Sequence, residues 1–393
     1  MSRSTAVDYE ERPWNSRISP DYLPLRQREM LAQPYRASVT PSIALLDLAL
    51  PDDLVAKVVE AQEGIIRFDN TVGHITAPFA AILLRSESAS SSEIENLSSS
   101  AKAIAEAQLG ERDSGNAPLI VANVRALEAA VAASDELTAE SIIAMHSQLL
   151  ESSDPDITGR FRTEQVWIGG GNYGPHNADF VPPHHDRVSD AIDDFIAYSL
   201  RPAPLPLAAI AVAHAQFETI HPFPDGNGRT GRALVQAALR RDGLTRGVTV
   251  PVSAGILQLR DEYFGALTSY RGGDVEQIVD VFAEGSFLAI ANGSQLVADI
   301  TAILDEWQDA LAGVRSDSAA RRILPVVLEQ PVVNSRLVRE RISASDPTLF
   351  TALDLLVERG VLDELTSRKR NRMWSAPKVL AALDAFARRS IRR

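Results

Sequence analysis

Twelve residues near the middle of the chain combine reactive side chains with residues that turn the backbone sharply. The run reads His-Pro-Phe-Pro-Asp-Gly-Asn-Gly-Arg-Thr-Gly-Arg and extends from His221 to Arg232. Gly226 and Gly228 permit tight turns and a close approach of the backbone to a ligand. A helix that begins directly after them presents free N–H groups and the positive end of its dipole. Together these features predict a site for an anion.

The charged residues of the same run indicate which anion would bind. Arg229 and Arg232 are spaced i, i+3 and can point the same way, which gives two guanidinium forks for phosphate oxygens. Asp225 is an oxygen ligand of the kind that Mg²⁺ shares with substrate phosphates. His221 is the one side chain in the run suited to act as a general base near neutral pH. The run therefore predicts phosphoryl or nucleotidyl transfer from a magnesium nucleotide, and it lacks the Gly-Lys-Ser/Thr of a Walker A loop.

The run resembles the signature of the Fic family, His-Pro-Phe-x-Asp-Gly-Asn-Gly-Arg-x-x-Arg, at every defined position. The resemblance extends to the helix that ends at Ile220. It also covers Gly-Arg-Phe-Arg at 159–162 and the segment Val-Trp-Ile-Gly-Gly at 166–170, which resemble the family's substrate-binding flap. In all, residues from about 40 to 290 are similar to multidomain bacterial Fic proteins that carry an N-terminal inhibitory helix.

This resemblance implies a protein adenylyltransferase, which moves AMP from ATP to a Ser, Thr or Tyr hydroxyl of a target protein and often of itself. His221 would take the proton of the hydroxyl, and Asp225 would hold Mg²⁺. The flap residues Val166, Trp167 and Ile168 would bind the target by strand addition. The residues implied in nucleotide binding are Gly226, Asn227, Gly228, Arg229, Thr230, Gly231, Arg232 and, for adenine, Phe264.

A regulatory element is implied by a second resemblance. Ser91 to Asn96 is similar to the Fic inhibitory motif Ser/Thr-x-x-x-Glu-Gly/Asn, in which the Glu, here Glu95, competes for the last motif arginine, Arg232. We expect an inhibitory helix at about residues 90–100 that begins near Ser90 to Ser92 with Ser as N-cap. The alternative is that Glu95 is a solvated helix residue in a Ser-rich segment.

Composition limits the remaining classes of protein. The 393 residues carry a net charge of −13 and contain no Cys, which excludes disulfides, thiolate metal sites, iron–sulfur clusters and a Cys nucleophile. No uninterrupted apolar run approaches the roughly 20 residues of a bilayer span, so no membrane partner is expected. The N-terminus lacks the apolar stretch of a secretory signal, and we expect a cytoplasmic protein.

The fold class predicted from sequence is mainly α. We expect an N-terminal arm and helical region at 1–110, a helical Fic core with a β-hairpin flap at 111–315, and a winged-helix domain at 318–393. Residues 1–40 are interpreted as an extended arm over the body or as partly disordered. Residues 157–183, bounded by glycines and closed by Pro182-Pro183, predict the hairpin.

The tail differs in charge from the rest of the chain. Residues 318–393 contain 15 Lys and Arg against 8 Asp and Glu, whereas the remainder has a balance of −20. A recognition helix near 346–359 and a wing carrying Arg368, Lys369, Arg370 and Arg372 would suit DNA. A protein-interaction or homodimer module with a solvated basic edge fits equally well.

Two other functions remain open. One is transfer of another nucleotide or of a phosphoryl group. The family's phosphotransferase branch carries Lys at the second loop glycine, so Gly228 favours AMP transfer. The other is a DNA-binding regulator whose core senses a nucleotide.

The histidines outside the run have simpler interpretations. His214 is expected to be a buried core histidine, and the histidines at 176, 184 and 185 show no zinc-site spacing.

Overall fold

The computed structural model describes residues 5–15, 24–75, 78–171, 173–366 and 372–391. It confirms a mainly helical chain with few strands. The contacts divide it into two compact units that alternate along the sequence. The first comprises residues 1–60, 129–242 and 261–283, and the second comprises 61–128, 243–260 and 284–393. The domain boundaries that we expect from the sequence, at residue 110 and at residues 315–318, stay a prediction.

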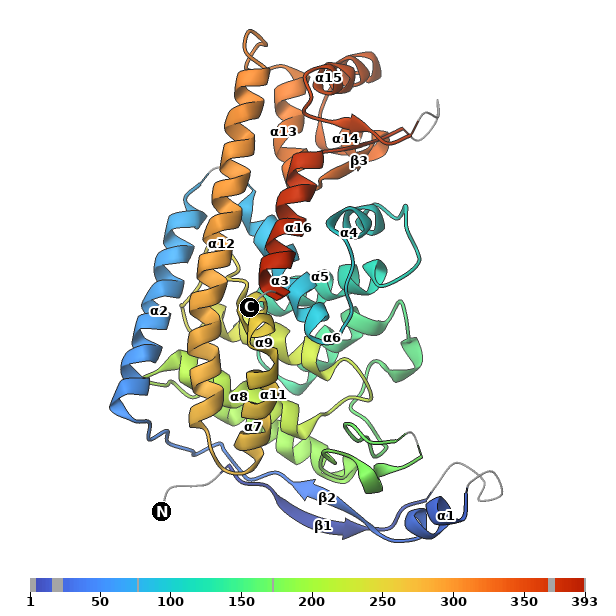
Figure 1. Ribbon diagram of the computed structural model, residues 1–393, viewed down its shortest axis with the longest axis vertical. Helices are drawn as coiled ribbons and strands as arrows, with labels where there is room; N and C mark the ends of the chain where they lie inside the picture. Colours follow the sequence, from blue (N-terminus) through green and yellow to red (C-terminus); the bar gives the residue numbers. More distant parts are fainter. Residues whose placement is uncertain (1–4, 16–23, 76–77, 172, 367–371, 392–393) are drawn as a thin grey trace. The chain divides into compact units, whose positions relative to one another are not determined.

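The first unit is built from one antiparallel ribbon and a group of packed helices. The ribbon pairs β1 (Asp8–Arg12) with β2 (Tyr35–Val39), as Figure 1 shows. In its register Asp8 lies opposite Val39. Helix α8 is buried along most of its length and packs against α7 and α9. Pro206 at its first turn fits a helix start, where no backbone N–H is needed. The elements are β1 (Asp8–Arg12), α1 (Leu25–Leu31), β2 (Tyr35–Val39), α6 (Ala139–Leu150), α7 (Val188–Ser199), α8 (Pro206–Ile220), α9 (Asn227–Arg241) and nearly all of α11 (Arg260–Arg271).

The second unit contains the Ser-rich helix and the C-terminal elements. It holds α3 (Phe79–Ile94), α4 (Ala101–Gln108), α10 (Val252–Gln258), α13 (Ala319–Glu329), β3 (Val332–Asn334), α14 (Ser335–Arg341), α15 (Asp346–Glu358), β4 (Asp363–Glu364), β5 (Met373–Ser375) and α16 (Pro377–Ile391). The three strands form an antiparallel sheet in the order β3-β5-β4, with Trp374 of β5 fully buried. Helices α2 (Asp52–Gly73), α5 (Ala117–Ala132) and α12 (Glu276–Ala310) contribute residues to both units.

The Ser-rich segment is not the start of a helix, so the expected helix at about 90–100 is wrong in its bounds. Helix α3 begins at Phe79 and ends at Ile94. Its serines are tolerated because they find acceptors: Ser86 Oγ donates to the carbonyl of Ile82, and Ser88 Oγ to that of Ile120. Asn96, at φ 62°, ends the helix in the left-handed region. A separate helix, α4, then starts after Ser100, whose side chain caps it.

The predicted flap hairpin is also wrong in its extent. Among the described residues of 157–183 there is a single antiparallel bridge, in which the N–H of Ile168 donates to the carbonyl of Phe180 at 2.9 Å. Gly169 and Gly170, at φ 71° and 72°, turn the chain out of an extended conformation immediately after the bridge. Pro182 and Pro183 lack the N–H groups that would extend it on the other side. The flap is therefore mostly loop, and Asn172 lies outside the described residues.

The described part of the N-terminal arm packs on the rest of the first unit; it is extended in β1 and β2 but helical in α1, so it is not the extended segment throughout that we expected. Val7 donates its N–H to Arg271 O at 3.0 Å, and Ser38 donates to Val181 O at 3.0 Å. Farther along, the carboxylate of Asp194 accepts the N–H of Ile43 at 2.6 Å. Residues 1–4 and 16–23 of the arm lie outside the described residues.

Helix α12 qualifies as a bilayer span by length and composition alone. Its most apolar window of 18 residues has a mean hydropathy of 1.5 and is 33% buried. The window contains no long uninterrupted apolar run, because Gly, Ser and Asn residues interrupt it. Core helices pass the same test, so this observation does not assign α12 to a membrane.

Candidate active site

The loop that carries the reactive residues begins with a strained turn. Helix α8 ends at Ile220, and His221 adopts a left-handed conformation with φ 50° and ψ 62° while its N–H still donates to Phe217 O at 2.9 Å. A non-glycine residue in this region costs roughly 1–3 kcal/mol and persists only where neighbours hold it. One such neighbour is Arg162, whose Nε donates to the carbonyl of His221 at 2.8 Å. The backbone of His221 is thereby held at the entrance of the loop.

An aromatic stack anchors the middle of the loop. The fully buried ring of Phe223 lies parallel to that of His146, with ring centroids 3.7 Å apart. Nε2 of His146 also contacts the backbone oxygen of Asp225 at 3.0 Å. Burial lowers the pKa of His146, so its ring is neutral near pH 7. The backbone of Asp225 is therefore held on the α6 side by a neutral, buried ring.

Asn227 braces the loop from within. Its Oδ1 accepts the N–H of Phe223 at 2.8 Å, and its Nδ2 donates to the carbonyl of the same residue at 2.8 Å. The resemblance implies that Asn227 takes part in nucleotide binding, which stays a prediction; the structure shows that its side chain shapes the loop. Contacts to an anion would then fall to the backbone N–H groups at the start of α9, which Asn227 opens.

The start of α9 is left open for an anion. Gly226, at φ 75°, is its N-cap, and no side chain caps the helix. A Cβ at Gly226 would come within 3.0 Å of a methyl carbon of Leu149, so only glycine fits there. Arg229 and Arg232, both 3% exposed, lie in the first turns of this helix, and Arg229 Nη2 reaches Asp225 Oδ2 at 3.2 Å. Two buried cations at the positive end of a helix favour a bound anion.

The electrostatic surroundings keep His221 neutral. Burial, together with the positive charges of Arg162 and Arg271, lowers the pKa of His221 to about 3, against weaker opposing effects of Glu218 and Asp225. A neutral imidazole can accept a proton at neutral pH. A bound polyphosphate would add negative charge beside the ring and raise its proton affinity.

Asp225 suits a metal ion shared with a ligand. Its side chain is 65% exposed, next to the open start of α9. The described residues contain no group of three or more His, Cys, Asp or Glu side chains that could hold a metal ion on their own. Because Mg²⁺ is commonly bound by one or two carboxylates plus substrate phosphates, the single carboxylate of Asp225 fits that arrangement.

Gly231 has a packing role that the sequence did not indicate, and the neighbouring Thr230 is buried. A Cβ on Gly231 would meet Glu218 Oε1 at 3.0 Å and the rings of Phe217 and His214 at 3.1 and 3.2 Å. Gly231 therefore permits the close packing of α9 on α8. Thr230 is 2% exposed, and its Oγ1 has no hydrogen-bond partner among the described residues.

The residues predicted outside the motif lie in different places. Phe264 of α11 is 46% exposed and packs beside the buried Tyr263. Tyr263 in turn hydrogen-bonds the buried His214, at 2.8 Å, which confirms His214 as a core residue. Val166, Trp167 and Ile168 are half-buried in the flap. Glu95 follows the end of α3 in the second unit, whereas Arg232 belongs to the first.

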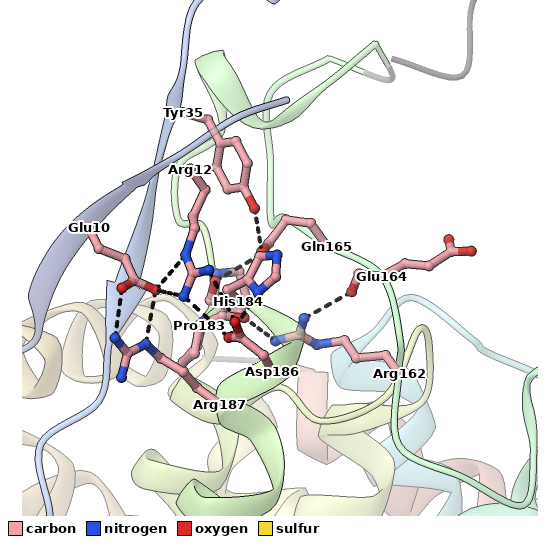
Figure 2. A network of polar contacts seen from close by, with 11 residues as sticks. Glu10, Arg12, Tyr35, Arg162, Glu164, Gln165, Pro183, His184, Asp186 and Arg187 are labelled. Carbon is pink, nitrogen blue, oxygen red and sulfur yellow. Dashed lines mark hydrogen bonds and ion pairs between the residues drawn. The ribbon is translucent and has the colours of Figure 1, made fainter. Parts of the chain in front are cut away.

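Arg162 is the main functional residue that sequence reasoning left without a role. It is 3% exposed and donates to the carbonyls of Glu164 and Pro183 (Figure 2). It also donates to the carbonyl of His221, so it ties the loop entrance to the flap. Burial lowers its pKa to about 10, so it stays charged at neutral pH. The Gly-Arg-Phe-Arg sequence at 159–162 was a signal for it, but the sequence does not reveal that the partners are backbone oxygens.

Comparisons with known proteins find similar sequences for the part of the chain that carries this loop. Residues 136–239 match the sequence model of the Fic/DOC family. Protein adenylyltransferase fic-1 of Caenorhabditis elegans is 31% identical over 156 residues, 40% of this chain and 28% of the relative. Protein adenylyltransferase Fic of Drosophila willistoni is 32% identical over 149 residues, 38% of this chain and 28% of the relative. The aligned region thus spans less than a third of these relatives.

A solved structure shares the fold over a larger part of the chain. A Fic family protein from Desulfovibrio desulfuricans G20 superposes with a TM-score of 0.54 at 22% identity, over 84% of this chain and 97% of that one. The likeness supports the mainly helical fold.

Proposed function

Because the chain carries a domain of the Fic/DOC family at residues 136–239, we propose that it is a protein adenylyltransferase that moves AMP from ATP to a hydroxyl of a target protein. The observation that carries this proposal is the braced loop, which sets a neutral histidine beside an uncapped helix start with two buried arginines. The relatives named protein adenylyltransferase support the choice of AMP as the transferred group.

In the proposed reaction, His221 accepts the proton of a Ser, Thr or Tyr hydroxyl. The hydroxyl oxygen then forms a bond to the α-phosphorus of ATP, and the bond to the β-phosphate oxygen breaks, so that pyrophosphate leaves with its electron pair. A positioned base contributes roughly 10²–10⁴-fold to such a step. Arg162 acts as a positioning residue, because it holds the backbone of His221.

The nucleotide is held by the start of α9. Its open N–H groups face the phosphates, and Arg229 and Arg232 neutralise the leaving pyrophosphate. Asp225 would hold Mg²⁺, which would supply charge neutralisation between the phosphates. The exposed ring of Phe264 offers a stacking surface for adenine.

We further propose that Glu95 inhibits the reaction by competing with the γ-phosphate for Arg232. The support is the inhibitory motif at 91–96 and the position of Glu95 directly after a helix end fixed by Asn96. Replacement of Glu95 by Gly is then expected to raise AMP transfer at least about tenfold. Labelling rates of the parent and the variant measure this, and equal rates would contradict the inhibitory role.

Transfer itself is tested with ATP labelled at the α- or the γ-phosphate, with Mg²⁺ and a cell extract. The parent, Glu95→Gly and the double variant Glu95→Gly/His221→Ala are compared. Protein-bound α-label that depends on His221 supports AMP transfer. Protein-bound γ-label alone would instead indicate phosphoryl transfer, and no label in any sample would overturn the proposal.

A further inference from the structure

The flap has few hydrogen bonds of its own to hold its shape. Among the described residues of 157–183, its two sides share the one bridge between Ile168 and Phe180. Next to this bridge, Pro182 and Pro183 have no N–H to donate, so a regular ladder cannot continue there. An isolated pair of strands is at best marginally stable in water. A flap that receives a target strand therefore needs support from another part of the chain.

The side chain of Gln165 supplies hydrogen bonds where the ladder stops. Its Nε2 donates to the carbonyls of Val166 and Pro182, both at 2.9 Å. These carbonyls belong to the two sides of the flap, before and after its turn. Because a carbonyl oxygen only accepts, the amide must turn its NH₂ group toward them and its Oε1 away. One side-chain amide thus links both sides of the flap, directly beside the predicted target-binding residues.

The N-terminal arm holds the other end of this amide. The hydroxyl of Tyr35 in β2 donates to Gln165 Oε1 at 2.9 Å (Figure 2). Burial raises the pKa of Tyr35 to about 12, so the hydroxyl keeps its proton at neutral pH and remains a donor. A chain of hydrogen bonds therefore runs from the arm through Gln165 to the backbone of the flap.

Further contacts of the arm keep Tyr35 beside the flap. The ring of Trp14 stands nearly perpendicular to those of Tyr35 and Trp167, with centroids 5.8 and 5.5 Å away. Edge-to-face contacts of this kind are favourable. The N–H of Ser38, also in β2, donates to Val181 O at 3.0 Å. The arm thus adds both ring packing and a backbone hydrogen bond to the sparse contacts within the flap.

Ion pairs fasten the arm to the segment that follows the flap. Glu10 binds Arg187 through both carboxylate oxygens, at 2.7 and 2.9 Å, and Arg12 reaches Asp186 at 3.1 Å (Figure 2). Hydrogen bonds from Arg187 and Arg12 lower the pKa of the Glu10 carboxyl to about 2, so its ion pairs persist at neutral pH. The pairs keep the ribbon of β1 and β2 next to the flap.

We propose that Gln165, held by Tyr35 of the arm, is a positioning residue for the protein substrate. It fixes the flap in the conformation that receives the target segment, and it acts through the backbone of Val166 and Pro182. The inference rests on the proposed AMP transfer and on target binding by the flap. Loss of the amide should weaken capture of the target protein and leave the nucleotide site at the start of α9 unchanged.

The test measures AMP transfer by the full chain in the Glu95→Gly background, with α-labelled ATP, Mg²⁺ and a dilution series of cell extract. The labelling rate of the most strongly labelled extract protein is followed against extract concentration. Gln165→Ala should raise the half-saturating extract concentration about tenfold, because each lost hydrogen bond is worth roughly two- to tenfold. The plateau rate and the half-saturating ATP concentration should stay within about twofold.

A second variant separates positioning from a general loss of structure. Tyr35→Phe removes one hydroxyl and should raise the half-saturating extract concentration about threefold. Added to Gln165→Ala, it should raise that concentration little further, since both act through the same amide. The control is Gln295→Ala, which removes an exposed amide that donates to Asp299 at 2.8 Å within α12. It should change neither concentration.

Three results would overturn the positioning role while leaving AMP transfer in place. The first is an unchanged half-saturating extract concentration in Gln165→Ala. The second is a loss confined to the plateau rate or to the use of ATP, and the third is effects of the two substitutions that multiply. Should Gln165→Ala fail to fold, the result for Tyr35→Phe alone decides. If no sample incorporates label, the transfer activity itself falls, so the two failures are distinct.

Discussion

Arginines in the catalytic loop and in the C-terminal region are placed in opposite electrostatic settings. Arg229 and Arg232 are almost fully buried in the first turns of α9, at the positive end of that helix. Arg339 and Arg341 lie in the last turn of α14, at its negative end, and pair with Asp346 and Glu329 at 2.7 and 2.9 Å. The dipole of α9 favours an anion beside the first pair of arginines, whereas the dipole of α14 favours the second pair of arginines where they are.

This difference shows why a count of positive charges is a poor guide to function. The tail has an excess of Lys and Arg, yet most of its described cations are already paired. Arg372, a residue of the predicted wing for which DNA binding and protein interaction were both left open, contacts Glu364 at 2.8 Å and Asp354 at 2.9 Å and lies over the ring of Trp374. The other wing residues, Arg368, Lys369 and Arg370, lie outside the described residues. The charges of the described tail favour a structural role.

The largest effect outside His221 is expected at Asn227. Replacement by Ala leaves the buried N–H and carbonyl of Phe223 without partners, which costs about 2–4 kcal/mol. We expect AMP transfer to fall more than about tenfold even where the variant remains folded, because the loop loses its shape. Labelling rates and denaturant unfolding measure both effects. Asn70→Ala, at an exposed helix position, is the control, and equal losses in the two variants would contradict the bracing role.

An intermediate effect is expected from acidification, because His214 and His221 both have a pKa of about 3 in the folded chain. The unfolded chain binds protons at its histidines near pH 6.5, so it is stabilised relative to the native state below that pH. The free energy of unfolding should therefore fall between pH 6.5 and 3. Denaturant unfolding at pH 7 and pH 5 measures the change, and His214→Gln should reduce it. Identical stability at both values would mean that these histidines are not held neutral.

The smallest effect is expected in the tail. Arg372→Gln should lower stability by no more than about 1 kcal/mol, since its ion pairs lie near the surface. It should leave AMP transfer unchanged, and neither the parent nor the variant should shift duplex DNA in a gel. A shift by the parent that weakens with salt and is lost in Arg372→Gln would show that the tail binds phosphates. The proposed contrast between the arginines of the catalytic loop and the paired arginines of the tail would then be wrong.

The sequence was a better guide to the chemistry of the site than to the contacts that hold the catalytic loop in shape. The residues from His221 to Arg232 were sufficient to predict phosphoryl or nucleotidyl transfer, and the resemblance to the Fic family narrowed this to AMP transfer. The brace made by Asn227 and the anchor made by Arg162 depend on contacts with backbone atoms, which no residue pattern displays.

The fold shows the same limit. The mainly helical class followed from periodicity, whereas the start of α3 did not. Its serines are helical because acceptors such as the carbonyl of Ile120, distant in sequence, satisfy them. The flap does not form the predicted hairpin because Gly169 and Gly170 adopt left-handed conformations. Glycine permits this conformation but does not require it, so the sequence alone does not predict it. Tertiary contacts decided each of these cases.

The central claim is that His221, held neutral on a braced loop, drives AMP transfer. The most direct measurement counts α-label bound to protein and pyrophosphate released in the same reaction, for the Glu95→Gly chain with and without His221→Ala. We predict equal amounts of the two products with His221 and a loss of about 10²–10⁴-fold in both without it. Equal labelling with and without His221, or label transfer without pyrophosphate, would contradict the account.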